Sequence, residues 1–228
     1  MRTAENEWMR HPDMPIPLGS VTLFGDLVVP PKAKGLILFS HGSGSSRRSP
    51  RNRMVAEVLN EQGFGTLLFD LLTEQEDEVE DLRFDIGLLT GRLSATVRWA
   101  TRRSALRALP VGLFGASTGA ASALRTAADE PDSVKAVVSR GGRPDLAMDA
   151  LPDVLAPTLL IVGGRDGPVI DMNEAALSAL RCTKELVIVP GATHLFEEPG
   201  KLDEVARLAV AWYRRFIVGD DRATAEED

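Results

Sequence analysis

The sequence predicts an α/β protein whose mostly parallel, twisted sheet is covered by helices on both faces. Six short runs are almost continuously apolar rather than alternating, which is typical of strands buried on both faces. Helical patterns separate these runs, and repeated strand–helix units imply right-handed crossovers between parallel strands. The length of 228 residues suits a single domain of this class. The predicted strands are 35–39, 66–71, 111–114, 134–139, 158–162 and 185–189.

The two ends of the chain differ in composition from the predicted core, which covers residues 16–218. Residues 1–15 are polar and contain prolines, so we expect an N-terminal arm rather than a core element. Two short segments, 20–23 and 26–29, are separated by Phe-Gly and predict an antiparallel hairpin. Residues 219–228 are polar and acidic, and we expect them to form a flexible tail.

Helix signals follow the predicted strands. Ser49, directly before Pro50, is typical of an N-cap with proline in the first turn. Asp171 lies three residues before Glu174, which is the spacing of a capping box. The other helical patterns cover 86–103, 118–128 and 205–216.

The net charge of −7 is unevenly distributed along the chain. The segment 74–81 carries −6 and the segment 219–228 carries −4, so the remainder carries +3. Four arginines lie together at positions 47, 48, 51 and 53. This cluster is too small for a nucleic-acid footprint, and no apolar run approaches the roughly 18 residues of a membrane span. We therefore expect neither nucleic acid nor membrane as a partner.

The N-terminal residues and the cysteine content indicate a cellular compartment. The first ten residues carry Glu5 and Glu7 and no apolar core, unlike a secretory signal. Cys182 is the only cysteine, so an internal disulfide is excluded. We expect a cytoplasmic protein that is a monomer or a small homo-oligomer.

A candidate nucleophile lies in the segment Gly-Ala-Ser-Thr-Gly at 115–119. This segment follows one predicted strand directly and opens an alanine-rich helix. A serine at a sharp strand-to-helix turn is held exposed over the sheet, and small neighbours let the strand and helix approach closely. The alternative is a glycine-rich turn with an incidental serine. The agreement of strand, turn and helix favours Ser117 as a nucleophile.

The candidate base is one of only three histidines. Activation of a hydroxyl requires an imidazole within hydrogen-bonding reach. His194 follows the last predicted strand, in a loop from which it can reach over Ser117. His41 is the rival, although its neighbours indicate that it shapes a loop, and His11 lies in the predicted arm. We expect His194 to be the base.

The candidate acid is Asp166, in the Gly-Gly-Arg-Asp-Gly-Pro turn that follows the strand 158–162. An aspartate there can accept a hydrogen bond from the imidazole and stabilise the imidazolium. A helix cap is the alternative role, but Asp171 is expected to supply that cap. Asp145 is the rival acid. Glu197 and Glu198 follow His194 too closely in the sequence.

An oxyanion-binding loop is predicted after the first parallel strand, in the sequence Ser-His-Gly-Ser-Gly-Ser-Ser at 40–46. Acyl transfer passes through a tetrahedral oxyanion that backbone N–H donors stabilise. We assign these donors to Ser43 and Thr118, with Gly42 and Gly44 allowing the loop to approach closely. A phosphate-binding loop is disfavoured because the lysine of a P-loop is missing.

Arginines at the same sheet edge are candidate substrate ligands. Arg47 leaves the oxyanion loop, and Arg140 ends the strand 134–139. Guanidinium groups bind carboxylate or phosphate by paired hydrogen bonds, so an anionic substrate is one hypothesis. The alternative is that these arginines are solvated or are paired with the acidic segment 74–81.

Four motifs together resemble the dienelactone-hydrolase-like branch of the α/β-hydrolases. The resemblance extends over about residues 18–218 and rests on HGSGSSRRSPRN, GASTGA, GGRDGPV and PGATHLFEEPG, in that order. It implies a triad of Ser117, Asp166 and His194, with no metal and no organic cofactor. Dienelactone hydrolases themselves have cysteine at the elbow, where this chain has serine. Dienelactone is therefore not expected as the natural substrate.

Cap domains of α/β-hydrolases usually enter between the strands 134–139 and 158–162, where only residues 140–157 are present here. We therefore expect no cap and an open site, bounded partly by the loop 72–85, which favours short acyl groups. The sequence predicts a serine hydrolase that cleaves a small carboxylic ester or lactone through an acyl-serine intermediate. A thioesterase, amidase or acyltransferase with the same triad is the alternative, as is a catalytically silent ligand-binding protein.

Overall fold

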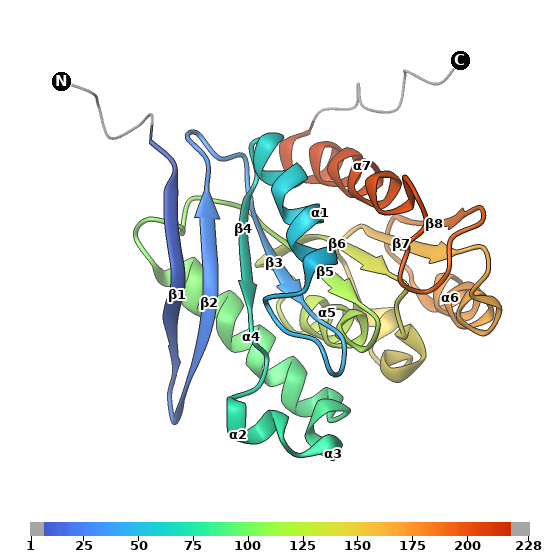
Figure 1. Ribbon diagram of the computed structural model, residues 1–228, viewed down its shortest axis with the longest axis horizontal. Coiled ribbons are helices and arrows are strands. Elements are labelled where there is room, and N and C mark those ends of the chain that lie inside the picture. The colour runs from blue at the N-terminus through green and yellow to red at the C-terminus, as the bar shows by residue number, and fades with distance from the viewer. Residues whose placement is uncertain (1–6, 220–228) are drawn as a thin grey trace.

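A computed structural model of the chain describes residues 7–219 and shows one sheet between two layers of helices (Figure 1). The first six residues of the predicted arm lie outside this range, as does the predicted tail from residue 220 onward. The strands are β1 Met9–Leu18, β2 Val21–Val29, β3 Leu36–Ser40, β4 Gly65–Phe69, β5 Val111–Ala116, β6 Val134–Arg140, β7 Thr158–Gly163 and β8 Lys184–Val189.

The sheet has the order β1-β2-β4-β3-β5-β6-β7-β8. Strands β3 to β8 run parallel, and β2 joins them antiparallel through β4, with β1 antiparallel at the edge. This mostly parallel sheet confirms the predicted fold class. The helices are α1 Pro50–Glu61, α2 Glu74–Asp77, α3 Glu80–Arg83, α4 Ile86–Arg102, α5 Thr118–Asp129, α6 Gly167–Ala179 and α7 Lys201–Tyr213, which continues as the π-helix η4 Arg214–Val218.

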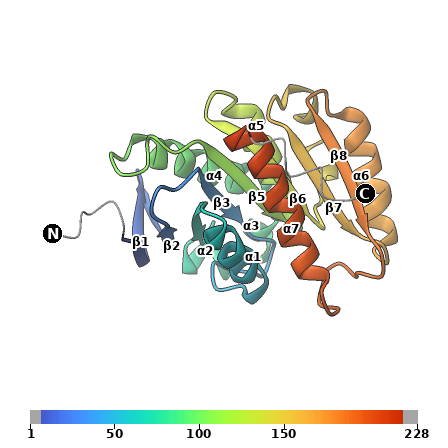
Figure 2. The ribbon, with the colours of Figure 1, turned by 90° about the horizontal axis from the view of Figure 1, so that it is seen from above.

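Two separate hydrophobic cores lie on opposite faces of the sheet. One contains Leu93 of α4 and Leu124 of α5, and the other contains Leu59 of α1 together with residues of α7. Neighbouring strand residues alternate between the cores, as Leu38 and Phe39 do, because successive side chains of a strand point to opposite faces. Figure 2 shows α1 and α5 on opposite sides of the strands. Burial on both faces explains the continuous apolar runs of the sequence.

The predicted hairpin within residues 20–29 is wrong. Strand β2 is continuous through this segment and pairs with β1 across a turn at Gly19 and Ser20. Gly25 lies inside the strand, where an added Cβ would be 2.9 Å from Cβ of Phe69. This glycine marks a close approach to β4 rather than a turn.

The predicted arm is also wrong from residue 9 onward, because β1 is a strand of the sheet. Its prolines are tolerated at this edge, where half of the backbone N–H groups need no ladder partner. The register shifts between His11 and Met14, and Asp13 has a positive φ of 49° in this bulge. The bulge directs the Asp13 side chain toward the loop after β3, with consequences described below.

Helix boundaries agree with the predicted caps in one case and disagree in another. Ser49 caps α1, and its side chain accepts a hydrogen bond from the backbone N–H of Asn52, as predicted. Helix α6 begins at Gly167 with Asp166 in the N-cap position, so the predicted cap at Asp171 is wrong. Pro168 fits the first turn of this longer helix.

Two connections shape the carboxyl edge of the parallel strands. The predicted loop 72–85 contains the short helices α2 and α3, and a capping box at Thr73 starts α2. Residues 140–157 contain only the 3₁₀ turns Pro144–Ala147 and Leu151–Asp153. No cap domain covers this edge within residues 7–219. No helix in the same range is long and apolar enough to span a membrane.

Candidate active site

The turn between β5 and α5 holds Ser117 in a strained conformation. Its φ of 53° and ψ of −124° are rarely adopted by a residue with a side chain. Such strain persists only where the surrounding structure enforces it, and it concentrates at functional sites. The backbone N–H of Ser117 donates to the carbonyl of Arg140, and its carbonyl accepts from the N–H of Arg143. These bonds hold the serine at the end of its strand.

Close packing around this elbow depends on two glycines. A Cβ at Gly119 would lie 2.2 Å from the carbonyl oxygen of Ser40, and a Cβ at Gly115 would lie 2.5 Å from Cα of Ala120. Neither position has room for a side chain without a backbone shift. The hydroxyls of Ser40 and Ser122, 2.7 Å apart, join β3 to α5 below the turn.

Ser117, His194 and Asp166 are connected by hydrogen bonds. His194 Nε2 is 3.3 Å from Ser117 Oγ, and His194 Nδ1 is 2.6 Å from Asp166 Oδ2. A carboxylate at Nδ1 fixes the tautomer in which Nδ1 carries the proton and Nε2 accepts from the serine hydroxyl. The structure therefore brings together the three side chains that the sequence predicts as nucleophile, base and acid.

Their exposures differ in a way that matters for proton transfer. The Asp166 side chain is 14% exposed, whereas the His194 side chain is 36% exposed. The carboxylate is thus shielded while the imidazole remains open to solvent at the carboxyl edge of the sheet.

The rival acids all have other partners. Asp145 forms two hydrogen bonds with Arg143, at 2.9 and 2.8 Å, and this pairing raises the pKa of the arginine. Glu197 pairs with Arg51 at 2.7 Å. Glu198 accepts from the N–H of Thr193, which lowers the pKa of its carboxyl. These three carboxylates brace the edges of the site.

His41 is buried and supports the oxyanion loop through hydrogen bonds to the backbone. Its Nε2 accepts from the N–H of Leu71 at 3.1 Å, and its Nδ1 lies 3.0 Å from the carbonyl of Gly42, to which it donates. Burial lowers the pKa of this imidazole, which keeps it neutral. With both ring nitrogens engaged by the backbone, His41 has the predicted loop-shaping role. His11 lies on the edge strand β1.

The predicted oxyanion donors lie next to each other, but one is engaged. The Ser43 N–H donates to Thr118 Oγ1 at 2.8 Å, which the sequence did not indicate. The Thr118 N–H is the first of α5 and has no intrahelical acceptor. Gly42 lies directly against the nucleophile, since a Cβ there would be 3.0 Å from Cβ of Ser117. Gly44 has a positive φ of 66°, which permits the turn of the loop.

Arg47 pairs with carboxylates of this chain, which compensate its charge. Its guanidinium pairs with Asp70 and Asp13 and lies 3.7 Å from Asp26, and its backbone N–H donates to Asp70. The side chain is only 11% exposed. The carboxylate partners of Arg47 are therefore not in the predicted segment 74–81, and its role as a substrate ligand stays a prediction. Arg47 instead fastens the oxyanion loop to β1, β2 and the end of β4.

Arg140 has a different environment. It is buried at the end of β6, and its guanidinium lies 6.0 Å from the ring centroid of Phe196, two residues after His194. Its Nη2 is 3.5 Å from Asn52 Oδ1. Arg140 forms no ion pair within residues 7–219.

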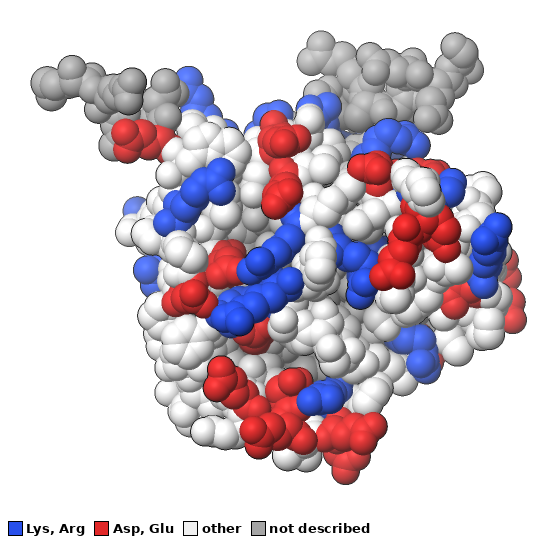
Figure 3. Space-filling view, viewed as in Figure 1, with Lys and Arg blue, Asp and Glu red and all other residues white. Residues whose placement is uncertain are grey.

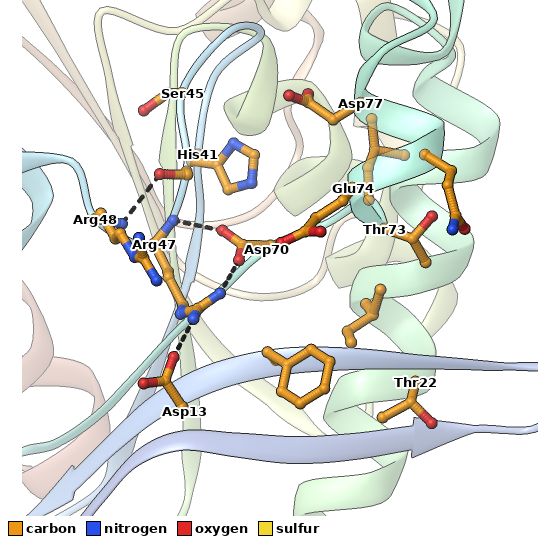
Figure 4. Close-up of a pocket in the computed structure, with 15 residues that line it drawn as sticks. Asp13, Thr22, His41, Ser45, Arg47, Arg48, Asp70, Thr73, Glu74 and Asp77 are labelled. Atoms are coloured by element: carbon orange, nitrogen blue, oxygen red, sulfur yellow. Dashed lines mark hydrogen bonds and ion pairs between the residues drawn. The ribbon is translucent and has the colours of Figure 1, made fainter.

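A cavity of about 670 Å³ opens beside the oxyanion loop (Figure 4). His41 and Ser45 form one wall, α2 forms the opposite wall, and β2 contributes Thr22 and the exposed Phe24. Ser117, Asp166 and His194 do not line it. On the face drawn in Figure 3, acidic side chains gather over α2 and α3 at the bottom of the view and basic side chains lie above them. The lining of the cavity contains both kinds, namely Asp13, Asp70, Glu74, Asp77, Arg47 and Arg48.

The sequence did not predict the β2 wall of this cavity, because the composition of segment 20–29 favours a hairpin. Exposed alternate residues such as Thr22 and Phe24, between buried neighbours, were the available signal. Within residues 7–219, no group of three or more potential metal ligands is clustered.

Comparison with known proteins links this site to a family. A sequence model described as the dienelactone hydrolase family matches residues 24–218. The crystal structure of a dienelactone hydrolase from Anabaena variabilis is 56% identical, with a TM-score of 0.89, and the alignment covers 92% of this chain and 98% of that one.

Two sequence relatives differ in length or distance. A Mycobacterium tuberculosis protein, provisionally named a phosphoribosyl transferase, is 53% identical over 92% of this chain but only 48% of its own length. The chain thus spans about half of this relative. A cutinase of Thermobifida cellulosilytica is 27% identical over 75% of this chain and 64% of its own. With the family match extending over nearly the whole described chain, the protein belongs to the dienelactone hydrolase family.

Proposed function

We propose that the chain hydrolyses a small carboxylic ester or lactone through an acyl-Ser117 intermediate. The observation that carries this proposal is the hydrogen-bonded series Ser117–His194–Asp166, at 3.3 and 2.6 Å, built on a strained elbow. A serine hydroxyl is a weak nucleophile until a base within reach accepts its proton. A base that is itself oriented by a carboxylate meets this requirement.

In the first half of the reaction, Ser117 Oγ attacks the carbonyl carbon while His194 Nε2 accepts the hydroxyl proton. The protonated imidazole is stabilised by Asp166, and it then donates that proton to the departing alkoxide. The ester C–O bond breaks and an acyl-serine remains. In the second half, His194 takes a proton from water, the hydroxide attacks the acyl carbon, and Ser117 recovers its proton as the acid leaves.

Charge that develops on the carbonyl oxygen needs donors close to Ser117. The Thr118 N–H at the amino terminus of α5 is one, aided by the positive end of the helix dipole. The Ser43 N–H is the second, and it exchanges its 2.8 Å bond with Thr118 Oγ1 for one with the substrate. Because the donor already lies beside the helix terminus, this exchange requires only a local movement.

The surroundings of the triad favour small, polar substrates. No cap domain covers the site within residues 7–219, and the neighbouring cavity of about 670 Å³ combines polar groups with the exposed ring of Phe24. Cavities of this size accommodate small-molecule ligands. We assign the cavity to one side of the scissile bond, although the triad residues themselves do not line it. A serine nucleophile, rather than cysteine, favours oxygen esters and lactones other than dienelactone.

The phosphoribosyl transferase name belongs to a relative about twice as long, of which this chain matches 48%. The strained elbow and hydrogen-bonded histidine of this chain are not required for phosphoribosyl transfer. The cutinase relative acts on esters by its name. We therefore retain ester hydrolysis as the proposed activity of this chain.

The test is a substrate panel of esters, lactones, thioesters and amides, run on the wild type and on Ser117→Ala. We expect turnover of at least one short ester or lactone, its loss in Ser117→Ala, and stoichiometric labelling of Ser117 by a fluorophosphonate. Preferred turnover of a thioester or amide would reassign the substrate while keeping the triad. Wild-type protein that is folded but neither labelled nor active would refute the proposal, and tight ligand binding without turnover would favour a binding protein.

A further inference from the structure

Two arginines beside the candidate active site have donors without an acceptor. Arg140 is only 6% exposed, and its Nε has no hydrogen-bond partner. The Nε of Arg51 is likewise buried and without a partner, although its Nη1 pairs with Glu197. Buried polar atoms are normally satisfied. The Nε atoms of Arg47 and Arg92 are also unpaired, but those guanidinium groups pair with carboxylates, as Arg51 does with Glu197. Of these four arginines, Arg140 is the one without a carboxylate partner in the described part of the chain.

The charge of Arg140 lacks a partner as well. A guanidinium has five N–H donors and no acceptor, yet its one hydrogen bond within residues 7–219 is the 3.5 Å contact with the neutral amide of Asn52. No carboxylate of the described chain pairs with it. Burial, reinforced by repulsion from Arg51, lowers the pKa of Arg140 to about 10. Buried charges in proteins are normally paired.

The elements around these side chains add positive potential. Arg51 and Asn52 lie in the first turn of α1, and this first turn contains no acidic residue. The amino terminus of a 12-residue helix carries a partial positive charge and favours anions. Arg140 approaches it from the end of β6, so a buried guanidinium and a helix terminus converge on one point.

This point adjoins the catalytic elements. The carbonyl of Arg140 accepts from the N–H of Ser117, and the guanidinium lies over the ring of Phe196 in the His194 loop. The Arg51–Glu197 pair joins the same loop to α1. The Arg51 side chain is 30% exposed, which leaves the site a solvent-facing side.

We propose that Arg140 and Arg51 form a binding site for an oxyanion, a carboxylate or a phosphate, between β6, α1 and the His194 loop. The anion supplies the counter-charge that Arg140 lacks and accepts hydrogen bonds from guanidinium N–H groups of both arginines. It is either a group of the substrate or a free anion that binds beside the triad. The first source rests on the proposed ester hydrolysis, whereas the second does not.

Binding is measured first, without reference to activity. The melting temperature of the full chain is titrated with inorganic phosphate against sodium chloride at equal ionic strength. We expect phosphate to raise the melting temperature of the wild type and of Arg53→Gln. Arg53 is the matched control because it lies on α1 and pairs with Asp26 instead. This rise in melting temperature is expected to disappear in Arg140→Gln and in Arg51→Gln. Because Arg51 is more exposed, Arg51→Gln keeps the test possible if Arg140→Gln does not fold.

Kinetics then distinguish the two sources. Hydrolysis of p-nitrophenyl butyrate is compared with that of p-nitrophenyl hemisuccinate, which adds a carboxylate at similar acyl length. For a substrate-borne anion, the ratio of kcat/KM for hemisuccinate to that for butyrate falls about tenfold or more in Arg140→Gln and Arg51→Gln. It stays within about twofold in Arg53→Gln. Phosphate then competes with hemisuccinate alone.

For a free anion, phosphate changes the rates with both esters equally, and the ratio is constant among the variants. The proposal is overturned if phosphate stabilises the wild type no more than chloride, or if its effect persists undiminished in both arginine variants. Failure of the hydrolase proposal is recognised separately, because it appears as unlabelled Ser117 while the melting experiment remains informative.

Discussion

Replacing Asp166 by Asn tests the role of the carboxylate that orients His194. The two residues are joined by a 2.6 Å bond between Oδ2 and Nδ1, and the Asp166 side chain is 14% exposed. Asn has nearly the same shape but presents an amide, whose NH₂ group donates rather than accepts. An amide donor facing Nδ1 favours the tautomer with the proton on Nε2. The imidazole then has no lone pair with which to accept the Ser117 proton.

The magnitude follows from the loss of both functions of the carboxylate. A wrong tautomer and an unstabilised imidazolium together lower kcat by about 10⁴ in serine hydrolases of this design, which corresponds to about 5.5 kcal/mol of activation free energy. KM is expected to change little, because Asp166 does not line the neighbouring cavity. The assay is kcat for a p-nitrophenyl ester, together with a melting curve that verifies folding.

Asp145→Asn is the matched control. Asp145 also follows a strand at the carboxyl edge, but Arg143 holds it with two hydrogen bonds. We expect its kcat to remain within a few-fold of the wild type. If Asp166→Asn retained more than a tenth of wild-type kcat, or if Asp145→Asn lost as much activity, the assignment of the acid would be refuted.

The remaining predictions concern the elbow and its supporting loop. Gly119→Ala places a Cβ 2.2 Å from the carbonyl of Ser40, so we expect a loss of about 1–3 kcal/mol in unfolding free energy by urea titration, and less activity. Gly91→Ala in α4, with nothing within 4 Å, is the control and is expected to be neutral or stabilising. Burial holds the pKa of His41 below its ordinary 6.5, so its contribution to stability is complete above that pH and is lost as the pH falls. The stability advantage of the wild type over His41→Gln should therefore shrink from about pH 7.5 to about pH 5, and a constant difference would contradict this. Arg47→Met leaves three carboxylates without their shared cation, and an unfolding free energy lower by about 2 kcal/mol is expected; unchanged stability would show that this cluster is only solvated.

Local sequence patterns determined the central part of the fold. The parallel strands were recognisable as nearly continuous apolar runs, because burial on both faces leaves few positions for polar side chains. The elbow was equally recognisable, since a serine flanked by small residues at a strand–helix junction is typical of an exposed nucleophile. The order of Ser117, Asp166 and His194 then placed the acid and base at the carboxyl ends of later strands.

The errors arose where a local signal had a non-local cause. Gly25 indicates a turn by composition, but it is required by the proximity of Phe69 on another strand. The prolines before it indicate an arm, yet they are compatible with an edge strand. The role of Gly25 and the tolerance of these prolines both depend on which strands become neighbours. The sequence of a single segment does not specify its neighbours.

Partners of polar groups were the least predictable part of the site. The Ser43 N–H was expected to face substrate, but the Thr118 hydroxyl 75 residues away accepts it. Arg47 resembles an anion ligand because its neighbours in sequence are basic, whereas its partners Asp13, Asp26 and Asp70 lie on or directly after three different strands. Charge in sequence therefore indicates little about charge in space.

The most direct test of this account is to detect the covalent intermediate. The wild-type protein is mixed with a short ester that it turns over, quenched in acid within the steady state, and digested for mass spectrometry. The peptide containing Ser117 is predicted to gain the mass of the acyl group, and Ser117→Ala is predicted to gain none. The mechanism would be contradicted by an unmodified Ser117 peptide during rapid turnover of an ester whose acyl-enzyme accumulates. Acylation at another residue that persists in Ser117→Ala would contradict it as well.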